Sequence, residues 1–344
     1  MKQRIGILTS GGDCPGLNAV IRGAVLKGTE LNDQEFIGFR DGWWGLVQGE
    51  TVRLDRKDIR GLAKEGGTIL GTSRFGPYEG PNGGADNIQK TLNRLGVDAV
   101  IAIGGEGTAA ASQRLFNEGI KIVGVPKTID NDLNATDYTF GFDTAVEIAT
   151  EAIDRLRTTG NSHKRCMVLE VMGRHAGWIA LHAGTAGGAH VILIPEHPES
   201  IEQICAWVEH VRDRGRAPMV VVAEGFKLPD MQEAYSVKGL DGFHRPRLGG
   251  IAEVLAPIIE ERTGIETRAT VLGHIQRGGV PTAFDRVLAT RLGMAVVDLV
   301  KDEEWGNMVA LRGTDIVRVG FEEALANPKN VPEHRYQEMR AIFG

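Results

Sequence analysis

Two polar clusters, each directly after a run of apolar and β-branched residues, constrain the fold of this chain more than any other feature. The first, Gly104 to Thr108 (GGEGT), follows Ala99 to Ile103, and the second, Pro126 to Asp132 (PKTIDND), follows Ile120 to Val125. Such a pattern indicates a loop at the carboxyl end of a strand, where open α/β sheets bind ligands. The first cluster suits a phosphate chain and a metal, and the second suits a hydroxyl that receives a phosphoryl group.

A third loop of this kind lies near the amino end. Residues 5–8 predict a buried strand, and the sequence TSGGDCPGLN at 9–18 leads from it into a helix expected from about Ala19 to Lys27. A strand, a glycine turn and a helix direct free backbone amides and the positive end of the helix dipole toward a ligand. The loop lacks the lysine of a P-loop and the GxGxxG spacing of dehydrogenases, so the residues alone leave a phosphate site and a structural turn both open.

The length and the repeated alternation of strands and helices predict two domains. A chain of 344 residues exceeds most single cores, and its 46 glycines suit an α/β protein with tight loops. The second half repeats the alternation, with a helix at 177–186, a strand at 190–194, a helix at 200–213 and a strand at 219–223. We therefore predict two doubly wound, Rossmann-like α/β/α domains with the active site in the cleft between them.

The expected boundaries follow from where the pattern changes. One domain is expected to span 1–141 plus about 276–325, and the other about 142–275. The segment 225–247 is long and polar, which favours a surface excursion. The tail at 326–344 is charged and is expected to be an exposed arm or a contact rather than catalytic.

Composition and charge exclude several classes of protein. The net charge of −6 argues against binding to nucleic acid or to an anionic membrane. Cys14, Cys166 and Cys205 show no CxxC spacing, which indicates reduced thiols in the cytoplasm and neither a disulfide framework nor a zinc site. Nothing in the sequence predicts a signal peptide or a membrane span. No basic cluster is assigned to an effector site, so regulation is left open.

Taken together, the motifs resemble those of the 6-phosphofructokinase family, and the resemblance runs from Ile5 to about Val300. The segments that carry it are SGGDxPGxN from Ser10, GGTILGTSRF from Gly66, GGEGT, PKTIDND, SHxR with EVMGR from Ser162 to Arg174, and ETRATVLGHIQRGG from Glu266. The family implies transfer of the γ-phosphoryl group of Mg-ATP to the 1-hydroxyl of fructose 6-phosphate, a step of glycolysis.

On the donor side, the resemblance assigns one group of residues to ATP: Gly11, Arg74, Phe75, Gly104, Gly105, Glu106, Gly107 and Thr108. Mg²⁺ is the implied cofactor, with Glu106 and Asp132 as its ligands. Glu106 departs from the aspartate that is usual in the family, but magnesium commonly keeps several waters, so an extra methylene is tolerable.

Two positions bear on the choice of donor. Pyrophosphate-using relatives carry an aspartate at the position of Gly107, which would occupy the space of the ATP α-phosphate, whereas glycine leaves that space open. Lys127 indicates the opposite, because ATP-using members commonly have glycine there and pyrophosphate users have lysine. We favour ATP, since an obstructing carboxylate excludes a ligand more strongly than an added cation does.

On the acceptor side, the resemblance makes Asp130 the general base, with Lys127 and Arg174 offsetting charge on the moving phosphoryl group. Residues expected to bind the substrate are Thr128, Asp130, Arg165, Met172, Gly173, Arg174, Glu224, Arg268, His274 and Arg277. Arg268, His274 and Arg277 are spaced about a strand end so that they can converge on one dianion. The resemblance also implies that Arg165, and by our expectation Arg268, could serve the site of a neighbouring subunit, which requires a dimer or a tetramer.

The sequence therefore predicts an ATP-dependent 6-phosphofructokinase whose partners are ATP and fructose 6-phosphate. One alternative is the pyrophosphate-dependent fructose 6-phosphate 1-phosphotransferase. An alternative of another class is a catalytically silent regulator that binds sugar phosphates.

Overall fold

The computed structural model describes residues 2–231, 235–240 and 246–344. The chain divides into two compact units, each described here by itself. Unit 1 comprises Met1–Ile129, Leu133–Thr144 and Arg277–Pro328, and unit 2 comprises Asp130–Asp132, Ala145–Gln276 and Lys329–Gly344.

Unit 1 contains a seven-stranded sheet of order β13-β12-β5-β4-β1-β2-β3. Neighbouring strands from β12 to β2 are parallel, and the edge strands β3 and β13 are antiparallel to their neighbours. The central strands are apolar and β-branched, as expected of a parallel sheet covered on both faces. The strands are β1 (Gln3–Thr9), β2 (Gln34–Phe39), β3 (Thr51–Leu54), β4 (Ala99–Gly104), β5 (Ile122–Pro126), β12 (Asn307–Arg312) and β13 (Asp315–Gly320).

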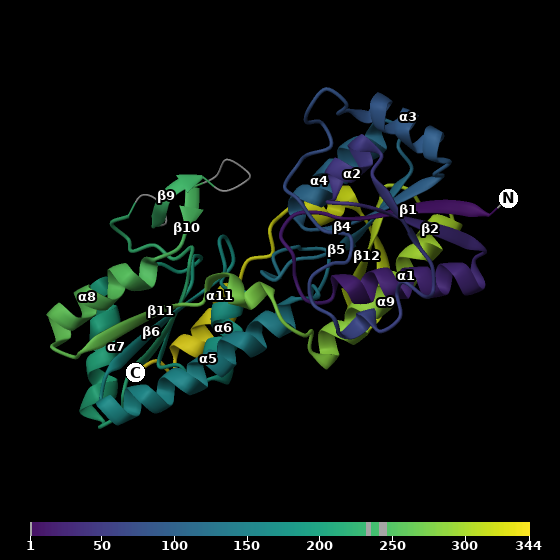
Figure 1. The fold of residues 1–344 in the computed structure, drawn as a ribbon. Coiled ribbons are helices and arrows are strands. Elements are labelled where there is room, and N and C mark those ends of the chain that lie inside the picture. Colours follow the sequence, from purple (N-terminus) through teal and green to yellow (C-terminus); the bar gives the residue numbers. More distant parts are fainter. Residues whose placement is uncertain (1, 232–234, 241–245) are drawn as a thin grey trace. The chain divides into compact units, whose positions relative to one another are not determined.

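Helices cover both faces of this sheet (Figure 1). On one face α1 (Leu17–Leu31) packs closely on α9 (Ala283–Lys301). A Cβ on Gly23 would lie 2.5 Å from the carbonyl oxygen of Thr290, and one on Gly293 would lie 2.2 Å from that of Val20, so glycine is required for this approach. The other helices of the unit are α2 (Trp43–Gln48), η1 (Leu62–Lys64), α3 (Ala85–Leu95), α4 (Glu106–Asn117) and α10 (Phe321–Leu325).

Unit 2 is built on a four-stranded parallel sheet of order β11-β6-β8-β7. A core of buried aliphatic residues joins α7 and α8 to one face of the sheet. The strands are β6 (Cys166–Val171), β7 (Val191–Leu193), β8 (Met219–Ala223) and β11 (Thr267–Val271), with a hairpin of β9 (Ser236–Leu240) and β10 (Pro246–Leu248). The helices are α5 (Phe142–His163), which begins in unit 1, α6 (Trp178–Ala186), α7 (Ile201–Asp213), α8 (Ile251–Thr263), η2 (Gly273–Arg277) and α11 (Glu333–Arg340).

The predicted fold class is confirmed, because both units are α/β with parallel sheets. The predicted strand and helix order from Gly177 to Ala223 is also found. The hairpin of β12 and β13 was not predicted. The chain passes from unit 1 to unit 2 after Thr144 and returns at Arg277, where the sequence predicted crossings near 141 and 276. The predicted cleft between domains stays a prediction.

Of the two expectations for the tail, an exposed arm or a contact, the last residues fit the contact, because they pack within unit 2. The Tyr336 side chain is 1% exposed, its hydroxyl donates to the Ile192 carbonyl over 3.1 Å, and its ring stacks on His197. The sequence does not reveal which residue makes the contact, because Tyr336 is the one buried residue of a mostly polar helix. The predicted excursion at 225–247 contains the β9 and β10 hairpin, and 232–234 and 241–245 lie outside the described residues.

Of the helices that the structure describes, none combines the length and the apolar character needed to span a lipid bilayer.

The starts of α5 and α9 are tied together in unit 1. The carboxylate of Asp285 is fully buried and accepts hydrogen bonds from the Thr144 backbone N–H, over 2.8 Å, and from its hydroxyl. In return, the Thr282 hydroxyl donates to Asp143 over 2.6 Å and accepts from the backbone N–H of Asp285. Burial raises the pKa of Asp285 to about 6.

Asp285→Asn should remove part of the pH dependence of folding stability. Because the folded pKa is raised, the native state holds the proton more tightly, so stability is present at low pH and is lost as pH rises from about 4 to about 6. The loss should be on the order of 3 kcal/mol. Urea unfolding of wild type and variant at pH 4.5 and 7 measures it, with exposed Asp302→Asn as control. An identical pH profile in wild type and Asp285→Asn would contradict this.

Candidate active site

Three of the predicted ligand loops lie side by side at the carboxyl edge of the unit 1 sheet. They follow β1, β4 and β5, which are neighbours in the order β5-β4-β1. Backbone hydrogen bonds connect them, from Ser10 N to Ile103 O and from Lys127 N to Gly104 O, both over 2.9 Å. The chain order reverses between β1 and β4, and this is the position at which open α/β sheets form a ligand crevice.

The first glycine loop is held from two sides. Gly11 adopts φ +82° and receives a hydrogen bond on its carbonyl from the Thr72 hydroxyl, over 2.7 Å. Lys127, which is 4% exposed, donates from its ammonium to the Gly12 carbonyl. Arg277 donates to the Asp13 carbonyl over 3.3 Å. Two cations thus stand beside one Gly-rich turn, which makes it attractive to anions.

The second glycine loop opens α4. A Cβ on Gly104 would lie 2.2 Å from the Thr108 hydroxyl oxygen, so glycine is required for the turn into the helix. Gly105 is the N-cap of α4 and provides no side-chain cap, which leaves the first backbone amides of α4 available to a ligand. Apart from its two chain neighbours and the adjacent backbone of α4, no heavy atom of the described residues lies within 4 Å of a Cβ built on Gly107. The space predicted for an α-phosphate is therefore open on the side of this residue.

The segment that carries Arg74 and Phe75 lies beside the first glycine loop. The Gly11 N–H donates to the Ser73 carbonyl over 3.2 Å, and the Ser73 hydroxyl donates to the Asp41 carbonyl over 2.6 Å. Arg74 follows directly and is exposed, while Phe75 packs against the unit 1 core. These positions are compatible with the predicted donor roles, which stay predictions.

The residues predicted to hold magnesium fit a weakly coordinated ion. Within 2–231, 235–240 and 246–344, no group of three or more His, Cys, Asp or Glu residues could enclose a metal. Glu106 is an exposed carboxylate in the first turn of α4, next to the available amides. One or two carboxylates with waters and substrate phosphates form the usual magnesium site, so this donor set suits Mg²⁺.

The second polar cluster spans the boundary between the units, with Asp130 to Asp132 in unit 2. Thr128 is fixed through its carbonyl, which accepts from the Thr139 hydroxyl over 2.7 Å. Asn131, 2% exposed, has φ +52°, a left-handed conformation that asparagine tolerates better than most residues. The turn at Asn131 sets the directions of the two flanking aspartates.

In unit 2, the carboxyl edge of the sheet brings several predicted substrate residues together. Met172, Gly173 and Arg174 follow β6, Glu224 follows β8, and His274 follows β11, and β8 and β11 are the two neighbours of β6. The Gly225 N–H donates to the Gly173 carbonyl over 3.1 Å. The structure therefore groups these five on one edge, as predicted for a shared substrate site.

Gln276, which the sequence analysis did not single out, connects two of these segments. Its side chain is fully buried, accepts from the Met172 N–H over 3.2 Å and donates to the Gly273 carbonyl over 3.1 Å. Buried Glu170 likewise joins the end of β6 to α8 by accepting from the Gly250 N–H, and its burial raises its pKa. No sequence signal reveals the Gln276 bridge, because its partner is 104 residues away.

Arg165 and Arg268 lie at the opposite, amino edge of the unit 2 sheet. Both pair with the carboxylate of Glu266, Arg165 over 2.7 Å, and hydrogen bonding to these arginines lowers the pKa of Glu266. Arg268 is the second residue of β11 and His274 lies beyond the end of this strand. An extended strand rises about 3.3 Å per residue, so roughly 10 Å of strand separates Arg268 from the end at which His274 lies. Their assignments to the sugar phosphate stay predictions.

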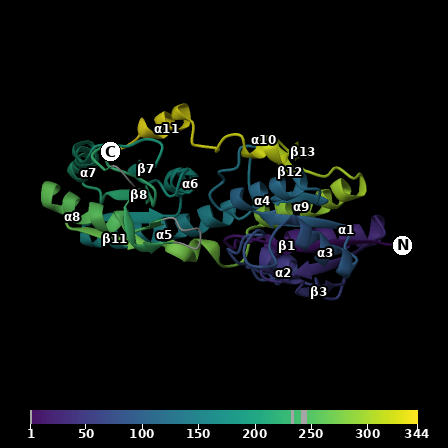
Figure 2. The ribbon, with the colours of Figure 1, turned by 90° about the horizontal axis from the view of Figure 1, so that it is seen from above.

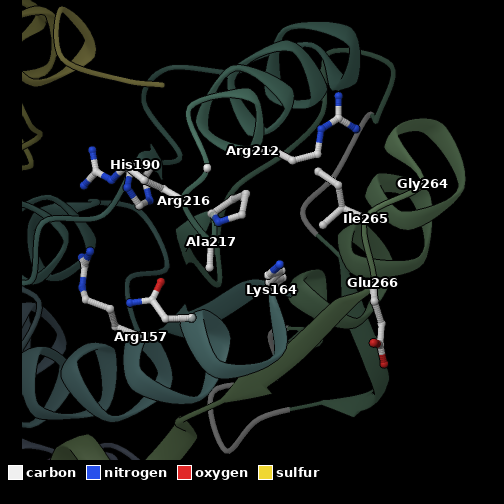
Figure 3. Close-up of a pocket in the computed structure, with 12 residues that line it drawn as sticks. Arg157, Lys164, His190, Arg212, Arg216, Ala217, Gly264, Ile265 and Glu266 are labelled. Carbon is white, nitrogen blue, oxygen red and sulfur yellow. The ribbon is translucent and has the colours of Figure 1, made fainter.

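A basic pocket of about 800 Å³ opens at the same edge of unit 2 (Figure 3). Its cations come from Arg157, Lys164, Arg212 and Arg216. They are spread over 60 positions of the sequence, which explains why no basic cluster was recognised there. His190 also lines the pocket; its Nδ1 accepts from the Met219 N–H, and burial, with Arg216 and Arg157, lowers its pKa to about 4.

Replacing Gln276 by Leu should destabilise the protein. The substitution leaves the buried Met172 N–H without its partner, at a cost of about 1–3 kcal/mol, and also removes the hydrogen bond to the partly buried Gly273 carbonyl. Urea unfolding measures the loss, and Gln89→Leu on the surface of α3 is the matched control. Equal stability of the two variants would contradict the bridging role.

The comparisons with known proteins agree with this arrangement. The family model described as phosphofructokinase matches residues 4–300. A protein of Amycolatopsis methanolica named pyrophosphate–fructose 6-phosphate 1-phosphotransferase is 58% identical over 99% of this chain and 100% of its own length. A protein of Streptomyces coelicolor named ATP-dependent 6-phosphofructokinase 3 is 51% identical over the same shares.

Solved structures give the same result. The T-state phosphofructokinase of Pichia pastoris is similar with a TM-score of 0.82 and 32% identity, over 99% of this chain and 36% of that longer chain. A pyrophosphate-dependent phosphofructokinase of Marinobacter aquaeolei has a TM-score of 0.82 and 25% identity, over 96% of this chain and 86% of its own. With its sheets, its loops and these similarities in agreement, the chain belongs to the phosphofructokinase family.

Proposed function

We propose that this protein transfers a phosphoryl group to the 1-hydroxyl of fructose 6-phosphate to give fructose 1,6-bisphosphate, as a cytoplasmic enzyme of glycolysis. The strongest support is that the three loops after β1, β4 and β5 lie side by side at one sheet edge of unit 1. Two of these loops are rich in glycine, and the third contains Lys127. The grouping of Met172 to Arg174, Glu224 and His274 at the carboxyl edge of unit 2 supports a sugar-phosphate acceptor.

The proposed mechanism is an in-line displacement. Asp130 accepts the proton of the attacking hydroxyl, and Lys127, Arg74 and Arg174 offset negative charge on the moving phosphoryl group. Glu106 and Asp132 are the proposed ligands of Mg²⁺, which when bound would neutralise charge on the donor phosphates. The backbone amides of the first turn of α4 and the Gly11 turn orient the donor, and orientation itself lowers the barrier.

For the donor we propose ATP, on the grounds of Gly107. An aspartate there would add bulk and negative charge, and the open space beside Gly107 supports a third phosphate. The products would then be ADP and fructose 1,6-bisphosphate.

Pyrophosphate is the second candidate donor, and the comparisons favour it over ATP. Relatives named for pyrophosphate are 57–58% identical, against 49–51% for those named ATP-dependent. Lys127 supports the same donor, because pyrophosphate-using members of the family carry lysine at this position and ATP-using members commonly carry glycine. Only ATP needs space for an α-phosphate beside Gly107. A substitution at position 107 is therefore the decisive test between the two donors.

Assays of the wild type with each donor, and of Gly107→Asp, separate the two candidates. We expect turnover with ATP in the wild type and at least a roughly tenfold higher KM for ATP in Gly107→Asp, equivalent to about 1.4 kcal/mol. Asn117→Asp, at the far end of the same helix, is the control for added charge. Turnover with pyrophosphate and none with ATP would refute the choice of ATP, and an unchanged ATP KM in Gly107→Asp would refute the steric argument.

Asp130→Asn should lower kcat by about 10²- to 10⁴-fold, the usual contribution of a general base, while fructose 6-phosphate still binds. Steady-state kinetics and calorimetric binding measure the two effects, with exposed Asp315→Asn as control. Full activity of the variant would remove Asp130 from its role. Binding of fructose 6-phosphate by a wild type that is inactive with either donor would instead favour the silent regulator.

Arg165 and Arg268 would act across a subunit boundary in a dimer or a tetramer. Their position at the amino edge of unit 2, away from Met172 to Arg174, supports this role. In that assembly, the sugar 6-phosphate would have to displace Glu266 from the two arginines.

A further inference from the structure

The segment around Lys329 returns the chain to unit 2 between α10 and α11, and it is drawn in yellow between these two labels in Figure 2. The sequence analysis expected the tail to be an exposed arm or a contact rather than catalytic. In the structure, Lys329 is the first residue of the returning segment and is partly buried. Its contacts within unit 2 reach the turn that carries the proposed base.

Lys329 binds this turn at two points. Its backbone N–H donates to the Asp132 carbonyl over 2.9 Å, and its side-chain ammonium lies 3.3 Å from the Asn131 side-chain oxygen. One residue thus holds both the backbone and the side chain of the two positions that follow Asp130. We expect that loss of either contact would move the backbone of this turn and so change the direction of the Asp130 side chain.

Lys329 is itself held in a fixed frame. Its carbonyl accepts a hydrogen bond from the Trp178 indole over 2.7 Å, and its ammonium lies 5.5 Å from the centroid of the Trp178 ring. Two residues later, the Val331 N–H donates to Glu196 over 2.8 Å. Glu196 also accepts from the Gly177 N–H over 3.1 Å, directly before α6. Contacts at the start of α6 therefore hold the segment 329–331, and Lys329 in this segment contacts the turn at Asn131 and Asp132.

The backbone conformation of Asn131 explains why the turn needs the contacts with Lys329. A left-handed φ of +52° costs an L-residue roughly 1–2 kcal/mol, so the turn requires contacts that favour it over an extended alternative. The side chain of Asn131 is 2% exposed, and the contact with the Lys329 ammonium is one that an extended alternative would lose.

We propose that Lys329 is a positioning residue for the phosphoryl transfer, which sets the orientation of Asp130 by holding Asn131 and Asp132. This rests on the proposed function, in which Asp130 is the base. Lys329 does not touch the reacting atoms in this account. It acts through the turn, so its loss should affect the rate of the chemical step more than the binding of either substrate.

Lys329→Met tests the proposal, because it keeps the backbone N–H and the length of the side chain but removes the ammonium. We expect kcat to fall by about 10- to 100-fold, the effect of a displacement of about 1 Å, with the KM values of both substrates changed little. Lys329→Arg should restore much of the rate. Arg335→Met, which removes an exposed cation on α11 in the same tail, should leave kcat unchanged.

Two further measurements distinguish positioning from a general loss of stability. Amide hydrogen exchange in a peptide covering 127–133 should rise in Lys329→Met and not in Arg335→Met. Asn131→Gly keeps the left-handed turn but removes the side-chain partner, so the double variant with Lys329→Met should be no slower than the slower single variant. Additive losses would overturn the route through Asn131.

The outcomes separate this proposal from the proposed function. If Asp130→Asn is inactive but Lys329→Met has wild-type kcat, the base assignment holds and the positioning role is overturned. If kcat falls in Lys329→Met without a rise in exchange at 127–133, the positioning role is overturned as well. If Asp130→Asn is fully active, the assignment of Asp130 as the base fails. In that case, unchanged amide exchange at 127–133 in Lys329→Met would show independently that Lys329 does not stabilise the turn.

Discussion

The proposed chemistry depends first on the parallel pairing of β1, β4 and β5. This pairing continues past the strand ends into the backbone hydrogen bonds from Ser10 to Ile103 and from Lys127 to Gly104. Because parallel strands end at the same sheet edge, the three loops after Thr9, Gly104 and Pro126 become one surface, although the first is far from the other two in sequence. A slip of one residue in either register would turn the side chains of the strand to the other face of the sheet and move the loop after it. The proposed donor site therefore depends on strand register before it depends on any side chain.

The sequence alone predicted what depends on local patterns. Runs such as Ala99 to Ile103 followed by glycines identify both a strand and the loop after it, and the serine cap at Ser200 identifies the start of α7. Contacts between side chains that are distant in sequence could not be predicted. The bridge from Gln276 to Met172, and the shared pairing of Arg165 and Arg268 with Glu266, depend on sheet order, which the residues do not encode locally. The contact of the tail could not be located for another reason, because Tyr336 is the one buried residue in a helix whose other residues are mostly polar.

For the choice of donor, identity over the whole chain and the residue at position 107 favour different answers. Identity over the whole chain is dominated by core and surface positions that never face a substrate, and it favours relatives named for pyrophosphate. Gly107 is one residue, but in the proposed site a carboxylate at this place would meet the donor, and the space beside Gly107 is otherwise open. Lys127 does not oppose ATP in the same way, since an ammonium beside the Gly12 carbonyl attracts any phosphate donor. A single-residue obstruction can thus outweigh an average taken over hundreds of positions.

The close contact between α1 and α9 has a consequence for the order of assembly on the ribosome. The early helix α1 must wait for α9, which begins at Ala283, before it can bury the surface around Gly23. The strands of unit 2, from Cys166 to Val271, emerge earlier and can complete their sheet while unit 1 is still open. Domains generally fold as units during synthesis, and contacts of long sequence separation form slowly. The four-stranded sheet of unit 2 is therefore expected to form before unit 1 closes, and Lys329–Gly344, with buried Tyr336, joins unit 2 last.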